Sequence, residues 1–217
     1  MKMKKQGMTL WIGVGALAAF VVWTLLLGTV DVRAIGPCDS SVGFATLNGW
    51  VHEKTGVNWA LYVLTDWMGL VPFAVAFGFA GMGFVQWVRR KRILAVDRSI
   101  LVLGVFYAVV GVLYLAFEVL SVNYRPVLIE GVLEASYPSS TTVLVSCILP
   151  TAMLQWRTRI QNKGVRRLVL TLCALFVAFT VIARLLSGVH WVSDIIGGAL
   201  LSAGLVALYA YASGIRS

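Results

Sequence analysis

The sequence has few charged residues and few of the side chains that bind metals. Only 12% of its 217 residues are Asp, Glu, Lys or Arg, whereas 59% are hydrophobic. A soluble globular domain carries about 25% charged residues, so this composition excludes that class and indicates a protein with several membrane-spanning segments. With nine acidic residues and two histidines, the sequence shows no metal-ligand cluster. We expect no metal and no other cofactor.

Cysteine is also scarce, and its positions argue against a disulfide framework. Cys38 lies between apolar runs, while Cys147 and Cys173 fall within them, so we expect no structural disulfide. Internal repeats, low-complexity tracts and a soluble segment are absent. The sequence therefore predicts one domain over residues 1–217.

Long uncharged stretches predict an all-α fold with six transmembrane helices. A helix needs ~20 apolar residues to cross a bilayer, and the candidate stretches are residues 7–30, 67–88, 99–117, 135–156, 168–183 and 195–215. The fifth reaches the required length only if it continues past Arg184 to about Ser187. The first follows a Lys-rich start, but it is long and no convincing small-x-small cleavage site follows, so we expect a retained helix.

The basic residues predict how the helices are oriented in the membrane. Six spans place both termini on one side, and that side holds fourteen of the eighteen Lys and Arg residues. Positive residues mark cytoplasmic loops, so both termini are predicted to be cytoplasmic in a multi-pass protein of the cell membrane. The net charge of +9 is explained by this orientation and by anionic lipid headgroups. We expect no nucleic-acid partner, which would require a basic folded face.

One motif near the end of the chain has the groups needed for phosphoryl transfer. Arg184-x5-His190-x3-Asp194 lies between two apolar runs, where charged groups are costly and are candidates for function. An imidazole can act as a nucleophile, a carboxylate can fix its tautomer, and a guanidinium can hold a phosphoryl oxygen. The alternative is structural: the histidine caps a helix and the arginine extends to lipid headgroups.

Two further segments on the predicted outer side fit anion binding. One is Arg125-Pro126, and the other is Pro138-Ser139-Ser140-Thr141 ahead of the fourth apolar stretch. Serines at a helix N-terminus offer hydroxyls and free N–H groups to a phosphate. The same residues also make an ordinary helix N-cap, and Arg125 alone is typical of a solvated loop.

The order of the three motifs resembles the type 2 phosphatidic acid phosphatase superfamily, membrane lipid phosphatases related to vanadium haloperoxidases. That family has Lys-x6-Arg-Pro, Pro-Ser-Gly-His and Ser-Arg-x5-His-x3-Asp on a six-helix core, and the resemblance covers roughly residues 118–194. It implies that His190 forms a phosphohistidine and that Asp194 orients it. It also implies that phosphoryl oxygens bind Arg125, Arg184, Ser139 and Ser140.

The sequence departs from the family motifs at four positions. Glu118 replaces the lysine, and Ala183 replaces the serine before the last arginine. In the second motif, Ser140 and Thr141 replace the glycine and the histidine. The family's general acid is therefore missing, and a threonine hydroxyl is too weak an acid to replace it. General acid catalysis is typically worth ~10²–10⁴ in rate.

Three functions are compatible with these departures. The first is hydrolysis of a lipid diphosphate, such as an undecaprenyl-diphosphate-like isoprenoid, whose leaving phosphate needs little help from an acid. The second is hydrolysis of a lipid monophosphate, with the proton supplied by one of His52, Glu118, Glu130, Glu134 and Tyr137. The third is a catalytically silent relative that binds or transports a phospholipid headgroup.

We expect the first function, in a site on the extracytoplasmic face that acts on a lipid phosphate from the bilayer. His190 and Asp194 are both present, and a phosphate receptor needs arginines but has no use for an orienting aspartate. His52 lies in a long outer connection, where a lone histidine is most often solvated.

Overall fold

The fold is known from a computed structural model that describes residues 2–215, with side chains from residue 7 onward. The basic side chains expected at the extreme ends, those of Lys2, Lys4, Lys5 and Arg216, lie outside the described residues. The helices are α1 (Lys2–Leu27), α2 (Ala45–Thr55), α3 (Trp59–Met68), α4 (Leu70–Arg90), α5 (Arg98–Val119), α6 (Ser140–Arg159), α7 (Lys163–Leu186) and α8 (Val192–Ser213). Short elements connect them: β1 (Arg33–Ala34), η1 (Pro37–Asp39), β2 (Ser41–Val42) and η2 (Ile93–Ala95).

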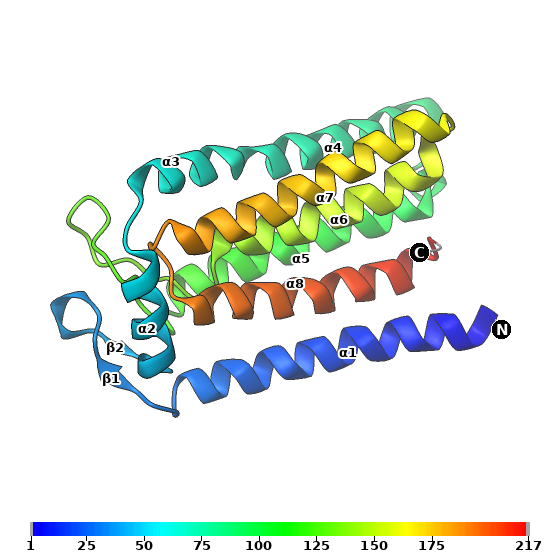
Figure 1. Ribbon diagram of the computed structural model, residues 1–217. Coiled ribbons are helices and arrows are strands. Elements are labelled where there is room, and N and C mark those ends of the chain that lie inside the picture. The colour runs from blue at the N-terminus through cyan, green and yellow to red at the C-terminus, as the bar shows by residue number, and fades with distance from the viewer. Residues whose placement is uncertain (1, 216–217) are drawn as a thin grey trace.

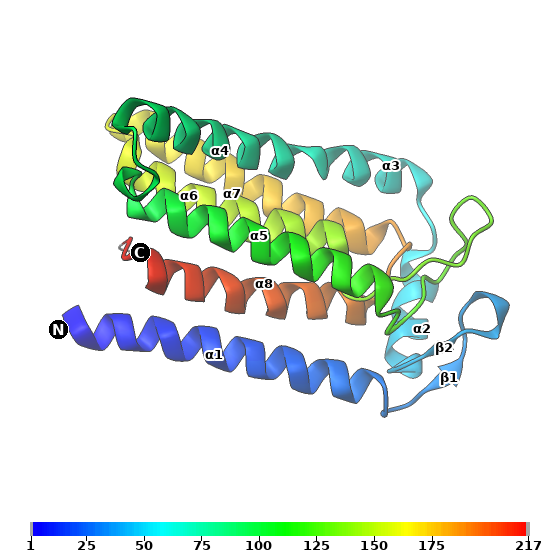
Figure 2. The same ribbon diagram turned by 180° about the vertical axis from the view of Figure 1, so that it is seen from behind.

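The long helices run alongside one another, and both ends of the chain lie at the same end of this bundle (Figures 1 and 2). At the opposite end, α2 lies across the bundle together with the antiparallel pair β1–β2 and the loop between α5 and α6. The predicted all-α membrane fold is confirmed. Because the His190 turn between α7 and α8 is at this capped end, the fold gathers the three motifs there.

Five helical segments are long and apolar enough to cross a membrane. They are Gly7–Leu27, Trp59–Arg90, Arg98–Val119, Lys163–Leu186 and Val192–Ser213. The sixth long helix, α6, is more polar and is enclosed by α4, α7 and α8. A helix covered by its neighbours needs no apolar face toward lipid, so the six-span count stays a prediction.

Three predicted helix boundaries are wrong for identifiable reasons. The segment predicted at 67–88 begins eight residues earlier, because the Asn58 side chain caps α3 by accepting the Leu61 N–H at 3.0 Å. The one predicted from residue 135 begins at Ser140, since extended residues and Pro138 precede it. The one predicted at 168–183 begins earlier, at Lys163, behind an Asn162 cap. Its expected continuation past Arg184 is confirmed, since α7 ends at Leu186.

The core lies where α6 and α8 meet α1, α4 and α5, and a polar cluster closes the bundle near the chain ends. Asp97 is 2.9 Å from Arg90 and 3.2 Å from Arg159. Hydrogen bonding to Arg90 is the main cause of the lowered pKa of Asp97. These contacts fix the junctions of α4, α5 and α6 at the end opposite the motifs.

Candidate active site

His190 lies in the tight turn between α7 and α8, and it is held from both sides. Its side chain is almost fully buried, with Nε2 3.2 Å from an Arg125 NH1 and Nδ1 3.5 Å from an Asp194 carboxylate oxygen. A guanidinium can only donate, so Nε2 must be the accepting, unprotonated nitrogen. The proton of the neutral imidazole is therefore on Nδ1, which faces Asp194. Nε2 carries the lone pair that a nucleophile requires.

Asp194 is fixed in the first turn of α8. Its carboxylate accepts the Trp191 backbone N–H at 3.0 Å and a weaker bond from the Asn123 amide at 3.4 Å. The residue has no solvent exposure. Because a carboxylate held by two donors has little freedom, it fixes the position of the imidazole beside it.

The loop between α5 and α6 brings Arg125 to His190. Backbone bonds pair Arg125 with Glu134 (3.0 Å) and Ser136 with Asn123 (2.8 Å), which closes the loop into a hairpin. The buried Arg125 guanidinium lies 3.0 Å from the Glu134 carboxylate through Nε. One cation is thus held directly over the nucleophilic nitrogen.

Arg184 supplies a second buried cation from the last turn of α7. Only 1% of the residue is exposed. Its guanidinium donates to the Thr65 hydroxyl at 3.2 Å, lies 3.8 Å from the Asp66 carboxylate and sits 5.0 Å from the Tyr62 ring centroid. Arg184 Nε is buried with no hydrogen-bond partner among the described residues. Since a buried donor normally has a partner, this nitrogen is available to an incoming anion.

The surroundings of His190 keep the imidazole neutral. Burial is the largest cause, and the charges of Arg125 and then Arg184 add to it, so the pKa of His190 lies well below 6.5. A proton on this ring would be poorly solvated and close to two cations. The ring is therefore unprotonated at neutral pH, as a nucleophilic role would require.

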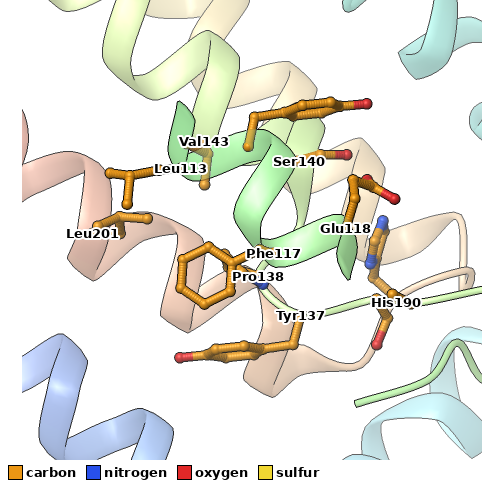
Figure 3. Close-up of a pocket in the computed structure, with 12 residues that line it drawn as sticks. Leu113, Phe117, Glu118, Tyr137, Pro138, Ser140, Val143, His190 and Leu201 are labelled. Atoms are coloured by element: carbon orange, nitrogen blue, oxygen red, sulfur yellow. The ribbon is translucent and has the colours of Figure 1, made fainter. Parts of the chain in front are cut away.

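The N-terminus of α6 forms another wall of the site. Ser140 lines a small pocket together with Glu118, Tyr137 and His190 (Figure 3). Ser139 is more restricted than expected, because its backbone N–H donates to the Asp194 carbonyl at 3.2 Å and its hydroxyl accepts from Thr142 at 3.1 Å. The N–H groups of the first turn of α6 are the remaining donors here.

The candidate proton donors occupy different places. Thr141 is buried and is not among the residues that line this pocket. His52 lies in a separate pocket, with its ring 5.5 Å from that of Trp191, and burial lowers its pKa. Glu134 is paired with Arg125. Of the five residues suggested as proton donors, Glu118 and Tyr137 line the His190 pocket.

Several residues that hold the site carry no signal in the sequence. Asn123 is 71 residues from Asp194, to which it donates, and Thr65 is 119 residues from Arg184, from which it accepts. Tyr62 and Asp66 contact Arg184 from the same distant segment as Thr65. No motif spacing connects such positions. The one available signal is that a charged residue, Asp66, interrupts an otherwise apolar segment.

No group of three or more His, Cys, Asp or Glu side chains that could hold a metal ion occurs in the described part of the chain. The positive charge in the site comes from Arg125 and Arg184. Chemically, the arrangement is a neutral imidazole with a fixed tautomer, two cations and a helix N-terminus. It can bind a phosphoryl group and attack it.

Fold and site together define a helical membrane protein in which a buried histidine lies close to a buried arginine at one end of the bundle. Residues 118–216 match the PAP2 superfamily, which confirms the resemblance inferred from the motifs. Among solved structures, the chain is similar to a transmembrane PAP2 type phosphatidylglycerolphosphate phosphatase from Bacillus subtilis, with a TM-score of 0.62 and 17% identity. The likeness covers 92% of this chain and 94% of that one, so the protein has a PAP2-type membrane phosphatase fold. No curated protein matches the sequence significantly.

Proposed function

We propose that the protein is a membrane phosphatase that hydrolyses an isoprenoid diphosphate through a phosphohistidine on His190. The observation that carries this proposal is the pair of contacts on the imidazole, Arg125 on Nε2 and Asp194 beside Nδ1. With these contacts, the lone pair of the imidazole is on Nε2, the nitrogen that faces the Arg125 cation. The phosphorus of a bound anion would lie beside this nitrogen. Electrostatic stabilisation of this kind is the main requirement of phosphoryl transfer.

In the proposed first step, Nε2 attacks the terminal phosphorus and the bond to the bridging oxygen breaks. Arg125, Arg184 and the first turn of α6 stabilise the charge on the transferred group, while Asp194 stabilises the imidazolium that forms. The leaving group is a lipid monophosphate, which departs as a weakly basic anion. The missing acid at Thr141 is therefore tolerated, which favours a diphosphate over a monophosphate.

The site is proposed to face the extracytoplasmic side. Arg89, Arg90, Arg157 and Arg159 lie in the last turns of α4 and α6, at the end of the bundle that also holds both chain ends (Figure 2). Basic residues favour the cytoplasmic side. The site is at the other end and would act on headgroups in the outer leaflet.

Phosphate release by the purified protein in detergent, with EDTA present, tests this function. We expect release from farnesyl diphosphate at least ten-fold faster than from farnesyl monophosphate or phosphatidic acid, because only the diphosphate leaves without a proton. Release from the monophosphates at equal or higher rates would contradict the diphosphate preference. Binding of these lipids without any phosphate release would show a silent relative instead.

A further inference from the structure

The second half of the reaction needs a proton acceptor. After the phosphohistidine forms, a water molecule must attack phosphorus and lose a proton. In the family that this chain resembles, the second motif carries a histidine, and here Thr141 takes its place. With a diphosphate substrate the leaving group needs no acid in the first step, but the attacking water of the second step still needs a base.

We propose that Glu118 is the general base that activates this water, a role that rests on the proposed function. Glu118 is in the last turn of α5 and lines the same pocket as His190 and Ser140. In Figure 3 its carboxylate and the imidazole of His190 are directed to the same end of that pocket. A carboxylate at this place can reach a water next to the phosphorylated nitrogen.

Two further features suit Glu118 to this role. The residue is exposed, so water has access to it from the outer end of the bundle. Within the described residues it makes no hydrogen bond or ion pair, whereas Glu134 and Asp66 are occupied by Arg125 and Arg184. In the part of the chain that the structure describes, the Glu118 carboxylate is therefore not neutralised by a neighbouring cation, unlike those of Glu134 and Asp66.

Tyr137, which lines the pocket, and Asp194, which lies behind His190, are less suited to this step. The Tyr137 hydroxyl is 2.7 Å from the Thr24 hydroxyl and points away from His190 in Figure 3. Burial raises the pKa of Tyr137, so its phenol stays protonated and cannot accept. Asp194 holds the imidazole through Nδ1 and is fully buried.

In the proposed step, every bond that forms is matched by one that breaks. One proton of the water passes to Glu118 as the water oxygen bonds to phosphorus and the phosphorus–Nε2 bond breaks. Inorganic phosphate leaves, His190 is neutral again, and Glu118 loses its proton to solvent. Ionised Glu118 also repels the anionic product, which favours its release.

The test compares Glu118→Gln with the control Glu130→Gln, using farnesyl diphosphate. Glu130 is an exposed carboxylate in the neighbouring loop that does not line the pocket. In Glu118→Gln we expect a burst of farnesyl monophosphate equal to the enzyme, followed by steady turnover lowered by ~10²–10⁴. Acid-labile, alkali-stable phosphate should accumulate on the protein. Glu118→Asp, which keeps a carboxylate, should turn over faster than Glu118→Gln, and Glu130→Gln should retain the wild-type turnover.

Hydroxylamine gives a second readout that a structural role would not produce. It is a stronger nucleophile than water and depends less on a base, so it should accelerate Glu118→Gln far more than the wild type. Wild-type turnover by Glu118→Gln would overturn the proposal, and so would slow turnover without phosphoenzyme accumulation. Failure of the proposed function would look different, because the wild type itself would then form no phosphoenzyme.

Discussion

At the scale of single residues, the site depends on a histidine that is kept neutral by its neighbours. The Arg125 guanidinium is 3.2 Å from Nε2, and a neutral ring is required because protonation would occupy the attacking lone pair. The Asp194 carboxylate is held 3.5 Å from Nδ1 by the Trp191 N–H and the Asn123 amide. In the proposed mechanism, His190, Asp194 and Arg125 therefore act as one unit.

The lowered pKa of His190 predicts a pH profile. A lowered pKa means that the ring stays unprotonated as the pH falls through 6.5, so the acid limb of kcat/KM should lie below pH 6.5. Arg125→Gln removes the nearer cation and should move this limb to higher pH. Both proteins are measured on the same lipid, so ionisation of the substrate affects the two pH profiles equally. Identical limbs at or above pH 6.5 would contradict the assignment.

The candidate site could be predicted from the sequence only where its residues share a motif. Arg184 lies at the end of α7, His190 in the turn that follows, and Asp194 at the start of α8. Because these positions are close in the sequence, one motif identifies all three residues. Asn123 and Asp66 could not be found in this way, because tertiary packing alone brings them to the site. The sequence shows that Glu118 departs from the lysine of the family motif. Only the structure shows that Glu118 lines the same pocket as His190.

At the scale of elements, the turn between α7 and α8 positions the nucleophile. Gly188 has a left-handed backbone with φ of 69°, and a Cβ there would lie 1.8 Å from the carbonyl oxygen of Gly56. The neighbouring Asn58 N–H donates to the Ser187 carbonyl at 2.9 Å. This close contact holds the start of α3 against the His190 turn.

Gly188→Ala should therefore damage both stability and activity. A non-glycine residue in the left-handed region costs roughly 1–2 kcal/mol, and the overlap with Gly56 forces the turn away from α3. We expect a lower Tm and at least ten-fold slower phosphate release. The matched control is Gly111→Ala on α5, where a Cβ would meet nothing within 4 Å, and its Tm should stay equal or rise. Equal Tm and turnover in both variants would show that the turn is not constrained.

Helix identity was more predictable than helix ends. Hydropathy identifies α1, α5 and α8 to within a few residues, because a membrane span is defined by its length and apolarity. Side-chain caps decide the beginnings of α3 and α7, and a run of extended residues delays α6. The polar helix α6 shows a further limit of prediction from hydropathy, because its place inside the bundle follows from packing against its neighbours.

At the scale of the whole molecule, the bundle separates its polar groups by end. The Asp97 cluster with Arg90 and Arg159 closes the end near the chain termini, while α2, the α5–α6 loop and the His190 turn form the other (Figure 1). The positive-inside pattern places these ends on opposite sides of the membrane in the proposed orientation. A phosphatase site at the outer end would meet lipid headgroups at the interface.

Covalent phosphorylation of His190 during turnover can be tested by rapid quenching with a diphosphate lipid radiolabelled on its terminal phosphate. We expect an acid-labile, alkali-stable label that maps to His190 in the wild-type protein. In His190→Ala, which removes the attacking nitrogen but leaves both arginines in place, we expect no label and no phosphate release. A label on another residue, or wild-type release by His190→Ala, would rule out a phosphohistidine on His190.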